Sequence, residues 1–233
     1  MAKCLIESSL LLIPVLTIAE PLCIIMKIFL TSILILCFIG VNAQHWSDIN
    51  ADLGISDTLD YPTEIRIYAG GGITNYTSLF RMYESEPDNW VAEFHEFWSK
   101  VDGVMEMKTQ KKILTAKSEM EYVYLNLFRS YIFDLPNRSD IGWKLMERGK
   151  IEKVERRKRR NGKPIMEWEV LGKQSMALDG TSYFFQAKNP YKSNEFEFGN
   201  PFFYKDKYPE IDEPKYVCEL IEIVRSEFEI WVE

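Results

Sequence analysis

Residues 64–98 have the sequence EIRIYAGGGITNYTSLFRMYESEPDNWVAEFHEFW, and this stretch decides the fold. Apolar and polar side chains alternate over residues 64–69, and aromatic and β-branched side chains are dense over 76–84 and 90–98, so three β-strands are predicted. The turns between them fall at Gly70-Gly71-Gly72 and at Glu86-Pro87-Asp88-Asn89. Because connections this short join neighbouring strands, we expect antiparallel pairing.

Two helices are predicted further along the chain. Over residues 119–133 the apolar side chains recur every three or four positions and form one stripe, which is typical of a helix packed on a core. Ser118, followed three residues later by Glu121, forms a capping box that predicts the start of this helix. A second stripe covers residues 214–228, and Asp212 or Glu213 is expected to cap it.

The remaining alternating segments predict two hairpins. Residues 150–171 alternate around Asn161-Gly162, a dipeptide typical of a two-residue hairpin turn. Residues 183–188 and 194–198 flank Asn189-Pro190. With about seven strands, two main helices and no regular alternation of strand and helix, the sequence predicts an α+β fold. We expect a mostly antiparallel sheet with both helices packed on one face, in a single domain over residues 63–233.

The composition indicates a folded domain with an acidic surface. Hydrophobic residues make up 46% of the chain and aromatic residues 14%, so extensive disorder is excluded for most of it. The net charge of −7 repels nucleic acid, and no nucleic-acid partner is expected. A local basic patch can still act against this average.

The first 43 residues predict export. Residues 26–43, MKIFLTSILILCFIGVNA, join Lys27 to an apolar run too short to span a bilayer comfortably, which is typical of a cleavable signal peptide. We expect cleavage between Ala43 and Gln44, which places the protein in the periplasm or outside the cell. Cleavage removes three of the four cysteines, so no disulfide can form within one mature chain.

The segments on either side of this signal are less regular. Residues 1–25 are interpreted as an extension that precedes a true start at Met26. If translation starts at Met1 instead, the segment stays uncut and predicts a membrane-tethered accessory protein. Residues 44–62 lack a periodic apolar pattern, which predicts a poorly ordered or loosely docked leader.

Residue types that carry catalysis are scarce and isolated. His95 has no HxH, HExxH or CxxC motif near it, so it is not predicted to bind a metal. Cys218 borders an apolar stripe, which predicts a buried, inert thiol. No cofactor is expected, and a non-catalytic role is favoured. A hydrolase that uses a pair of carboxylates remains the enzymatic alternative, because the chain is rich in Asp and Glu.

The sharpest charge feature is the run Arg156-Arg157-Lys158-Arg159-Arg160. Its place beside Asn161-Gly162 puts it at a hairpin tip, where long charged side chains are readily solvated. The functional alternative is a docking patch for an acidic protein, a polysaccharide or a phospholipid headgroup. Trp90, Trp98, Trp143 and Trp168 are candidates for stacking on sugars, although core packing is the commoner role of tryptophans on strands.

Two stretches carry a likeness to other proteins. These are IRIYAGGGITNYTSLFRMY (residues 65–83) and DGTSYFF (179–185) with the later NPFFYKDKYPEIDEPKY (200–216). Together with a short signal ending at Ala43-Gln44, they resemble small exported proteins of unknown function common in Bacteroidota. The resemblance implies a bacterial envelope setting and no known activity. We therefore expect an exported protein with a binding or interaction role, in contact with a membrane only if its N-terminal segment is uncleaved.

Overall fold

The computed structural model describes residues 46–71, 74–157, 164–173, 175, 177 and 180–231, without the side chain of Arg157. The predicted signal peptide (26–43), its cleavage site at Ala43-Gln44 and the extension 1–25 lie outside these residues. The described elements are α2 (Trp46–Leu53), β1 (Glu64–Gly70), β2 (Tyr76–Glu86), β3 (Asn89–Trp98), β4 (Lys108–Leu114), α3 (Met120–Arg129), β5 (Glu147–Arg157), β6 (Pro164–Lys173), β7 (Ser182–Lys188), β8 (Ser193–Gly199), α4 (Pro201–Lys207) and α5 (Asp212–Phe228).

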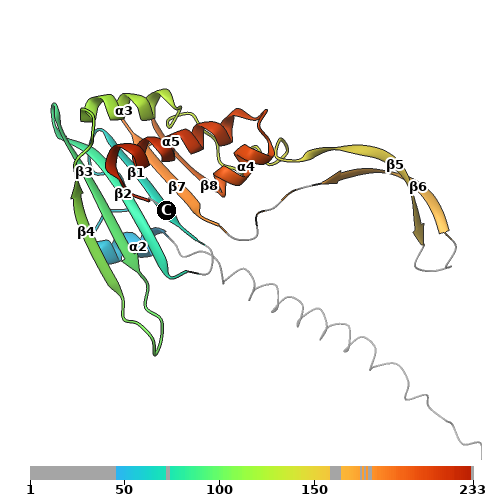
Figure 1. Ribbon diagram of the computed structural model, residues 1–233, viewed down its shortest axis with the longest axis horizontal. Helices are drawn as coiled ribbons and strands as arrows, with labels where there is room; N and C mark the ends of the chain where they lie inside the picture. Colours follow the sequence, from blue (N-terminus) through green and yellow to red (C-terminus); the bar gives the residue numbers. More distant parts are fainter. Residues whose placement is uncertain are drawn as a thin grey trace, which may run out of the picture. The chain divides into compact units, whose positions relative to one another are not determined.

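Six of the strands form one antiparallel sheet in the order β4-β3-β2-β1-β7-β8 (Figure 1). The predicted α+β class and the antiparallel pairing of residues 64–98 are confirmed. In the centre of the sheet Ile67 lies opposite Phe80 on β2 and Phe185 on β7, so all three side chains point to the same face. All three are fully buried. The alternation of apolar residues thus fixes the register, because a slip of one residue would turn this row toward the other face.

The hairpin predicted over residues 150–171 is present, but it is not part of this sheet. Strands β5 and β6 pair only with each other among the described strands, as a separate two-stranded ribbon (Figure 1). The expected sheet of about seven strands is therefore replaced by a six-stranded sheet and a hairpin. The sixth strand, β4, has the sequence KTQKKIL and is largely exposed. Lysine-rich sequences are common on edge strands because they discourage pairing with another chain, and this composition hides the alternation that marks a buried strand.

Helices α3 and α5 cover one face of the six-stranded sheet, as predicted (Figure 1). The apolar stripe of α5 is buried there, and the ring of Phe228 lies 4.9 Å from that of Phe80. Four side chains of this stripe, Val217, Leu220, Ile221 and Val224, have no exposed surface. Because burial of an aliphatic side chain of this size contributes about 1.5–3 kcal/mol, this stripe is a large part of the folding free energy.

The predicted capping of the two helices is wrong. Helix α3 begins at Met120, and Ser118 does not cap it. Instead, the backbone N–H and the hydroxyl of Ser118 donate to the carboxylate of Glu227 on α5, at 2.9 and 3.0 Å. In a capping box the Ser118 N–H would bond to Glu121; here it bonds to Glu227, so the contact with α5 replaces the local capping box. Helix α5 begins at Asp212, and the residue before it, Ile211, makes no side-chain cap.

The leader expected to be poorly ordered contains helix α2. Its Ile49 and Asn50 are buried, and the Tyr68 hydroxyl donates to the Asn50 side chain over 2.9 Å. The Trp46 ring stacks on Phe184 at 5.7 Å between centroids. Tyr68 and Phe184 alternate with the core residues of β1 and β7, so α2 lies on the face opposite α3 and α5. Two buried residues in an eight-residue helix are too few to give an apolar period in the sequence. No helix in the described ranges is long and apolar enough to cross a membrane.

Candidate functional site

The β5–β6 hairpin has one face on which apolar side chains gather. The register places Ile151 opposite Val170, Lys153 opposite Trp168 and Glu155 opposite Met166, all on the same face. We call Ile151, Met166, Trp168 and Val170 the Trp168 face. Their exposed fractions are 69%, 53%, 69% and 66%. These values are those of surface residues, although the residue types are those of a core.

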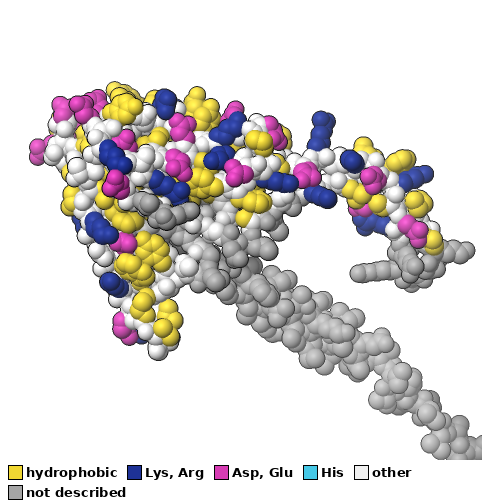
Figure 2. All heavy atoms as spheres, in the orientation of Figure 1, with side chains coloured by type: hydrophobic (Ala, Val, Ile, Leu, Met, Phe, Trp, Pro, Cys, Tyr) yellow, Lys and Arg dark blue, Asp and Glu magenta, His cyan; other side chains and the backbone are white. Residues whose placement is uncertain are grey.

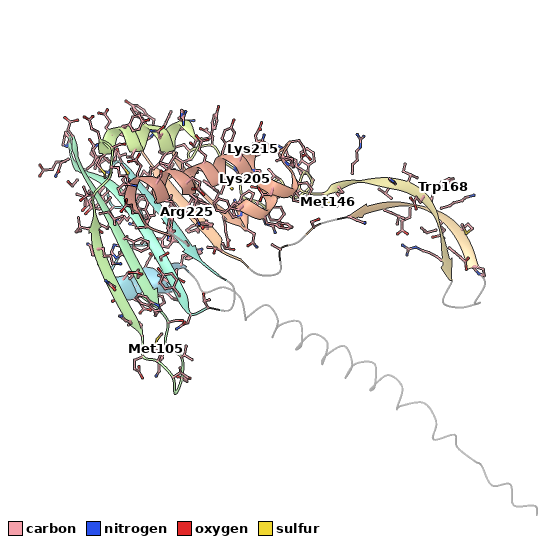
Figure 3. The ribbon with its side chains drawn as sticks, viewed as in Figure 1. Met105, Met146, Trp168, Lys205, Lys215 and Arg225 are labelled. Carbon is pink, nitrogen blue, oxygen red and sulfur yellow. The ribbon has the colours of Figure 1, made fainter. Side chains whose placement is uncertain are left out.

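Basic side chains lie beside these apolar ones. The Lys153 ammonium group lies 5.3 Å from the centre of the Trp168 ring, which is within range of a cation–π interaction. On the opposite face of the ribbon, Arg156 forms an ion pair with Glu169 across the two strands. Figure 2 shows hydrophobic and basic side chains mixed on the hairpin, and Figure 3 labels Trp168 on β6.

The base of the hairpin is held by one ion pair and one close backbone approach. Glu147 and Lys207 of α4 lie 3.0 Å apart, and this hydrogen bond lowers the pKa of Glu147 and raises that of Lys207. The register shifts between Glu147 and Lys150. At Gly149, between them, a Cβ atom would come within 2.7 Å of Val170 and 2.9 Å of the Gly172 nitrogen. Glycine is therefore required for the two strands to meet at this point.

The predicted docking patch is only partly described. Arg156 is exposed, and Arg157 is the last residue of β5, where it pairs with Pro164. Lys158, Arg159, Arg160 and the predicted turn at Asn161-Gly162 lie outside the described residues. The structure therefore places Arg156 and Arg157 at the end of β5, and the position of the patch as a whole stays a prediction.

A network of buried charges lies on the sheet face that α2 covers. One Glu64 oxygen accepts from the Nε atoms of Arg66 and Arg81, both at 2.7 Å. The other accepts from the backbone N–H groups of Asp60 and Tyr61, at 2.7 and 3.0 Å. Burial alone would raise the pKa of Glu64, but the bonds from Arg81, Tyr61 and Arg66 outweigh it and hold the pKa below its ordinary value. Glu64 is therefore ionised and fully satisfied.

A second carboxylate, Glu93, lies next to this network. It accepts from the Tyr83 hydroxyl at 3.1 Å and from Lys111 at 2.7 Å, and its other oxygen lies 3.1 Å from Nε2 of His95. Burial opposes ionisation, yet the bonds from Lys111 and His95 lower the pKa of Glu93. Burial also lowers the pKa of His95, against the pull of Glu93, so the imidazole is neutral at pH 7.

Glu93 and His95 line a small cavity of about 180 Å³. The C-terminal end of α2 and the turn after it border the cavity on one side, and β2, β3 and β4 on the other. In the charge network as a whole, three bases (Arg66, Arg81, Lys111) balance three acids (Asp60, Glu64, Glu93). These short contacts connect β1, β2, β3 and β4 with one another and with the segment before β1.

The other residues considered for chemistry do not come together. The Cys218 thiol is buried on α5, on the helix-covered face, and burial raises its pKa to about 12. His95 lies on the opposite face of the sheet, so the two do not form a nucleophile and base pair. Within the described part of the chain, no group of three or more His, Cys, Asp and Glu side chains is placed to hold a metal ion. Gly71, at φ +115°, belongs to the connection between β1 and β2, as predicted, and Gly72 is not described.

The sequence did not reveal that the Trp168 face is uncovered. Met166, Trp168 and Val170 alternate with glutamates just as Phe196 and Phe198 do on β8, yet both phenylalanines are buried. Only the density of basic residues around the hairpin sets it apart. Searches of protein-family models, of curated proteins and of solved structures found no match to this chain.

Proposed function

We propose that this chain is an exported, non-catalytic binding protein of the periplasm or cell surface, which docks on a negatively charged partner through its β5–β6 hairpin. One observation carries the proposal. Four apolar side chains stand exposed on one face of a ribbon whose strands pair with no other described strand. Exposed apolar groups gathered on one surface commonly mark an interaction site.

The energetics of a lone hairpin support this role. An isolated two-stranded ribbon is marginally stable in water, because each strand has one open edge and neither face is covered. A partner that covered the Trp168 face would contribute about 1.5–3 kcal/mol for each side chain that it buried completely. Binding would therefore stabilise the ribbon as well as hold the partner.

The state of the buried carboxylates supports a role without catalysis. A glycosidase-like pair requires one carboxylic acid with a raised pKa that can donate a proton. The pKa values of Glu64 and Glu93 are both lowered, and each accepts several hydrogen bonds. Neither is suited to act as a general acid, so the hydrolase alternative has no candidate acid in this network.

Export is tested by the mass of the protein recovered from its own host. A chain beginning at Gln44 is the expected result, and it would be found in the periplasm or the medium. A full-length chain in the cytoplasm would overturn the export part of the proposal. A full-length chain in the membrane fraction would favour the tethered alternative instead.

Docking is tested by sedimentation with washed cell envelopes of the host. The chain from Gln44 onward is expected to sediment with the envelopes, and Trp168→Ser is expected to remain in solution. Trp143→Ser is the matched control, because Trp143 is equally exposed (73%) but precedes the hairpin. Equal sedimentation of both variants with the unmodified chain would refute the hairpin as the docking element.

A further inference from the structure

We infer that the negatively charged partner of the hairpin is an anionic phospholipid surface, on which the ribbon lies flat with its Trp168 face toward the acyl chains. This inference rests on the proposed function and names the partner of the same site. Three properties of the hairpin lead to it: its exposed apolar face, its concentration of basic charge and its open edges.

The apolar face suits a surface with no fixed shape. Ile151, Met166, Trp168 and Val170 belong to two adjacent strands of a ribbon and share one side of it. Apolar contact is non-directional, so it does not require a partner of fixed shape. A bilayer interface offers apolar surface over an area much larger than the hairpin. Tryptophan is the residue enriched at membrane interfaces, since its ring is amphipathic. Lys153, 5.3 Å from the Trp168 ring, can bury its aliphatic stem there and keep its ammonium group at the phosphates.

Basic charge is concentrated in the hairpin, against the average of the chain. By sequence, residues 147–173 contain ten Lys and Arg and five Asp and Glu, a charge of +5, which leaves −12 on the rest of the chain; four of the ten bases lie outside the described residues. Clusters of four to eight bases beside an apolar anchor are typical of anionic-lipid binding, and each base at the surface strengthens binding by about fivefold. The hairpin therefore attracts an anionic surface that the rest of the protein repels.

The length of the ribbon keeps the repulsion between the anionic surface and the acidic remainder of the chain small. β6 has ten residues, so the ribbon is about 33 Å long. At physiological ionic strength charges are screened beyond about 8 Å, so contacts near the tip are only weakly affected by the acidic remainder of the chain.

The open edges of the ribbon set the depth of binding. Neither the outer edge of β5 nor that of β6 pairs with another described strand. Unpaired backbone groups are not tolerated in the hydrocarbon region, but they can bond to water among the headgroups. The hairpin is therefore placed at the interface and does not span the bilayer. Membrane contact through the hairpin does not require an uncleaved N-terminal segment. From the sequence alone, we expected membrane contact only if that segment stayed uncleaved.

Flotation with defined vesicles tests this inference. The chain from Gln44 onward contains the whole compact unit 46–233 and lacks the apolar N-terminal segment, which would bind vesicles by itself. The vesicles contain either phosphatidylcholine alone or phosphatidylcholine mixed with phosphatidylglycerol. We expect binding to the mixed vesicles, at least about tenfold weaker binding to the neutral ones, and loss of binding when the ionic strength rises from about 0.1 M to about 1 M.

Two variants test the contribution of apolar insertion, whereas the lipid composition and the ionic strength test that of charge. Trp168→Ser is expected to weaken binding to the mixed vesicles at least about tenfold, and Val170→Thr, which keeps a β-branched side chain in the strand, about fivefold. Trp143→Ser should bind like the unmodified chain, and all three should keep the same melting temperature of the main domain.

Several results would overturn the lipid assignment. They are no binding to mixed vesicles, equal binding to neutral vesicles, or binding that Trp168→Ser and Val170→Thr leave unchanged. If the chain sediments with envelopes in a Trp168-dependent way but binds no vesicles, the proposed function stands and its partner is a protein or a polysaccharide. If Trp168→Ser changes neither assay, both proposals fail.

Discussion

Replacing Glu64 by glutamine should destabilise the protein far more than the exchange of one oxygen for an NH₂ group suggests. Both oxygens of Glu64 are fully used, one by Arg66 and Arg81 and the other by two backbone N–H groups. In Glu64→Gln, the amide NH₂ takes the place of one of the two oxygens. It then faces either the two arginines or the two backbone N–H groups, and it cannot accept a hydrogen bond from them. The side chain of Arg66, which has no exposed surface, then keeps only Asp60 as a charged partner, at 3.4 Å.

The magnitude follows from the burial of this group. Breaking a buried ion pair by removal of one charge costs about 3–5 kcal/mol, because the remaining charge is left desolvated. For a domain of 150–250 residues, this corresponds to a fall in melting temperature of about 6–20 °C. The control is Glu229→Gln, because Glu229 pairs with Lys117 at 3.0 Å but both side chains are more than half exposed. Exposed pairs are worth about 0–1 kcal/mol, so the control should be nearly neutral.

The assay is urea denaturation, followed by circular dichroism, of the chain from Gln44 onward and of both variants. The free energy of unfolding of Glu64→Gln should be lower than that of the control by at least about 2 kcal/mol, with the same dependence on urea concentration. Equal stability of the two variants would refute the reasoning that Glu64 organises the charge network.

Three further predictions concern single side chains. Because burial lowers the pKa of His95, the unfolded chain binds a proton at this residue more readily than the folded chain, and the free energy of unfolding should fall as the pH drops below about 6.5. In urea unfolding curves, His95→Gln should lose less stability than the unmodified chain between pH 7.5 and 5.5. An equal loss in both proteins would contradict this prediction. The Cys218 thiol, whose pKa burial raises to about 12, should react with a thiol reagent only after unfolding, and reaction of the native protein at the rate of a free thiol would show that the site is open. Ser118→Ala should lower the free energy of unfolding by about 1 kcal/mol, because the hydroxyl bond to Glu227 is lost, and Glu121→Gln should change it little. A larger loss for Glu121→Gln than for Ser118→Ala would support the capping box instead.

The sheet was predictable from sequence because many apolar side chains of its strands fall on alternate positions and share one face. Ile67 follows Arg66 and Phe196 lies between two glutamates, and short turns leave few ways to pair the strands. β4 and α2 were not predicted, since β4 has almost no buried side chain and α2 buries only Ile49 and Asn50. Periodicity reports burial, so an element that buries little gives little signal.

The candidate site was only half predictable for a related reason. The charge run that begins at Arg156 is visible in the sequence, and the turn expected beside it predicts a position at the hairpin tip. The exposure of Trp168 does not follow, because alternation shows that side chains share a face and not what covers that face. The ion network around Glu64 was also missed, since residues 60, 64, 66 and 81 meet only through strand pairing and the path of the chain before β1.

We expect above all that a partner covers the Trp168 face in the bound, functional state of the protein. Hydroxyl-radical oxidation followed by mass spectrometry measures this directly, on the unmodified chain in buffer and bound to host envelopes. The chain offers matched pairs, since Trp168 and Met166 on the hairpin have counterparts of similar exposure in Trp143 and Met107. We expect oxidation of Trp168 and Met166 to fall severalfold on binding, while oxidation of Trp143 and Met107 stays the same. Unchanged oxidation of Trp168 in the bound protein would contradict it.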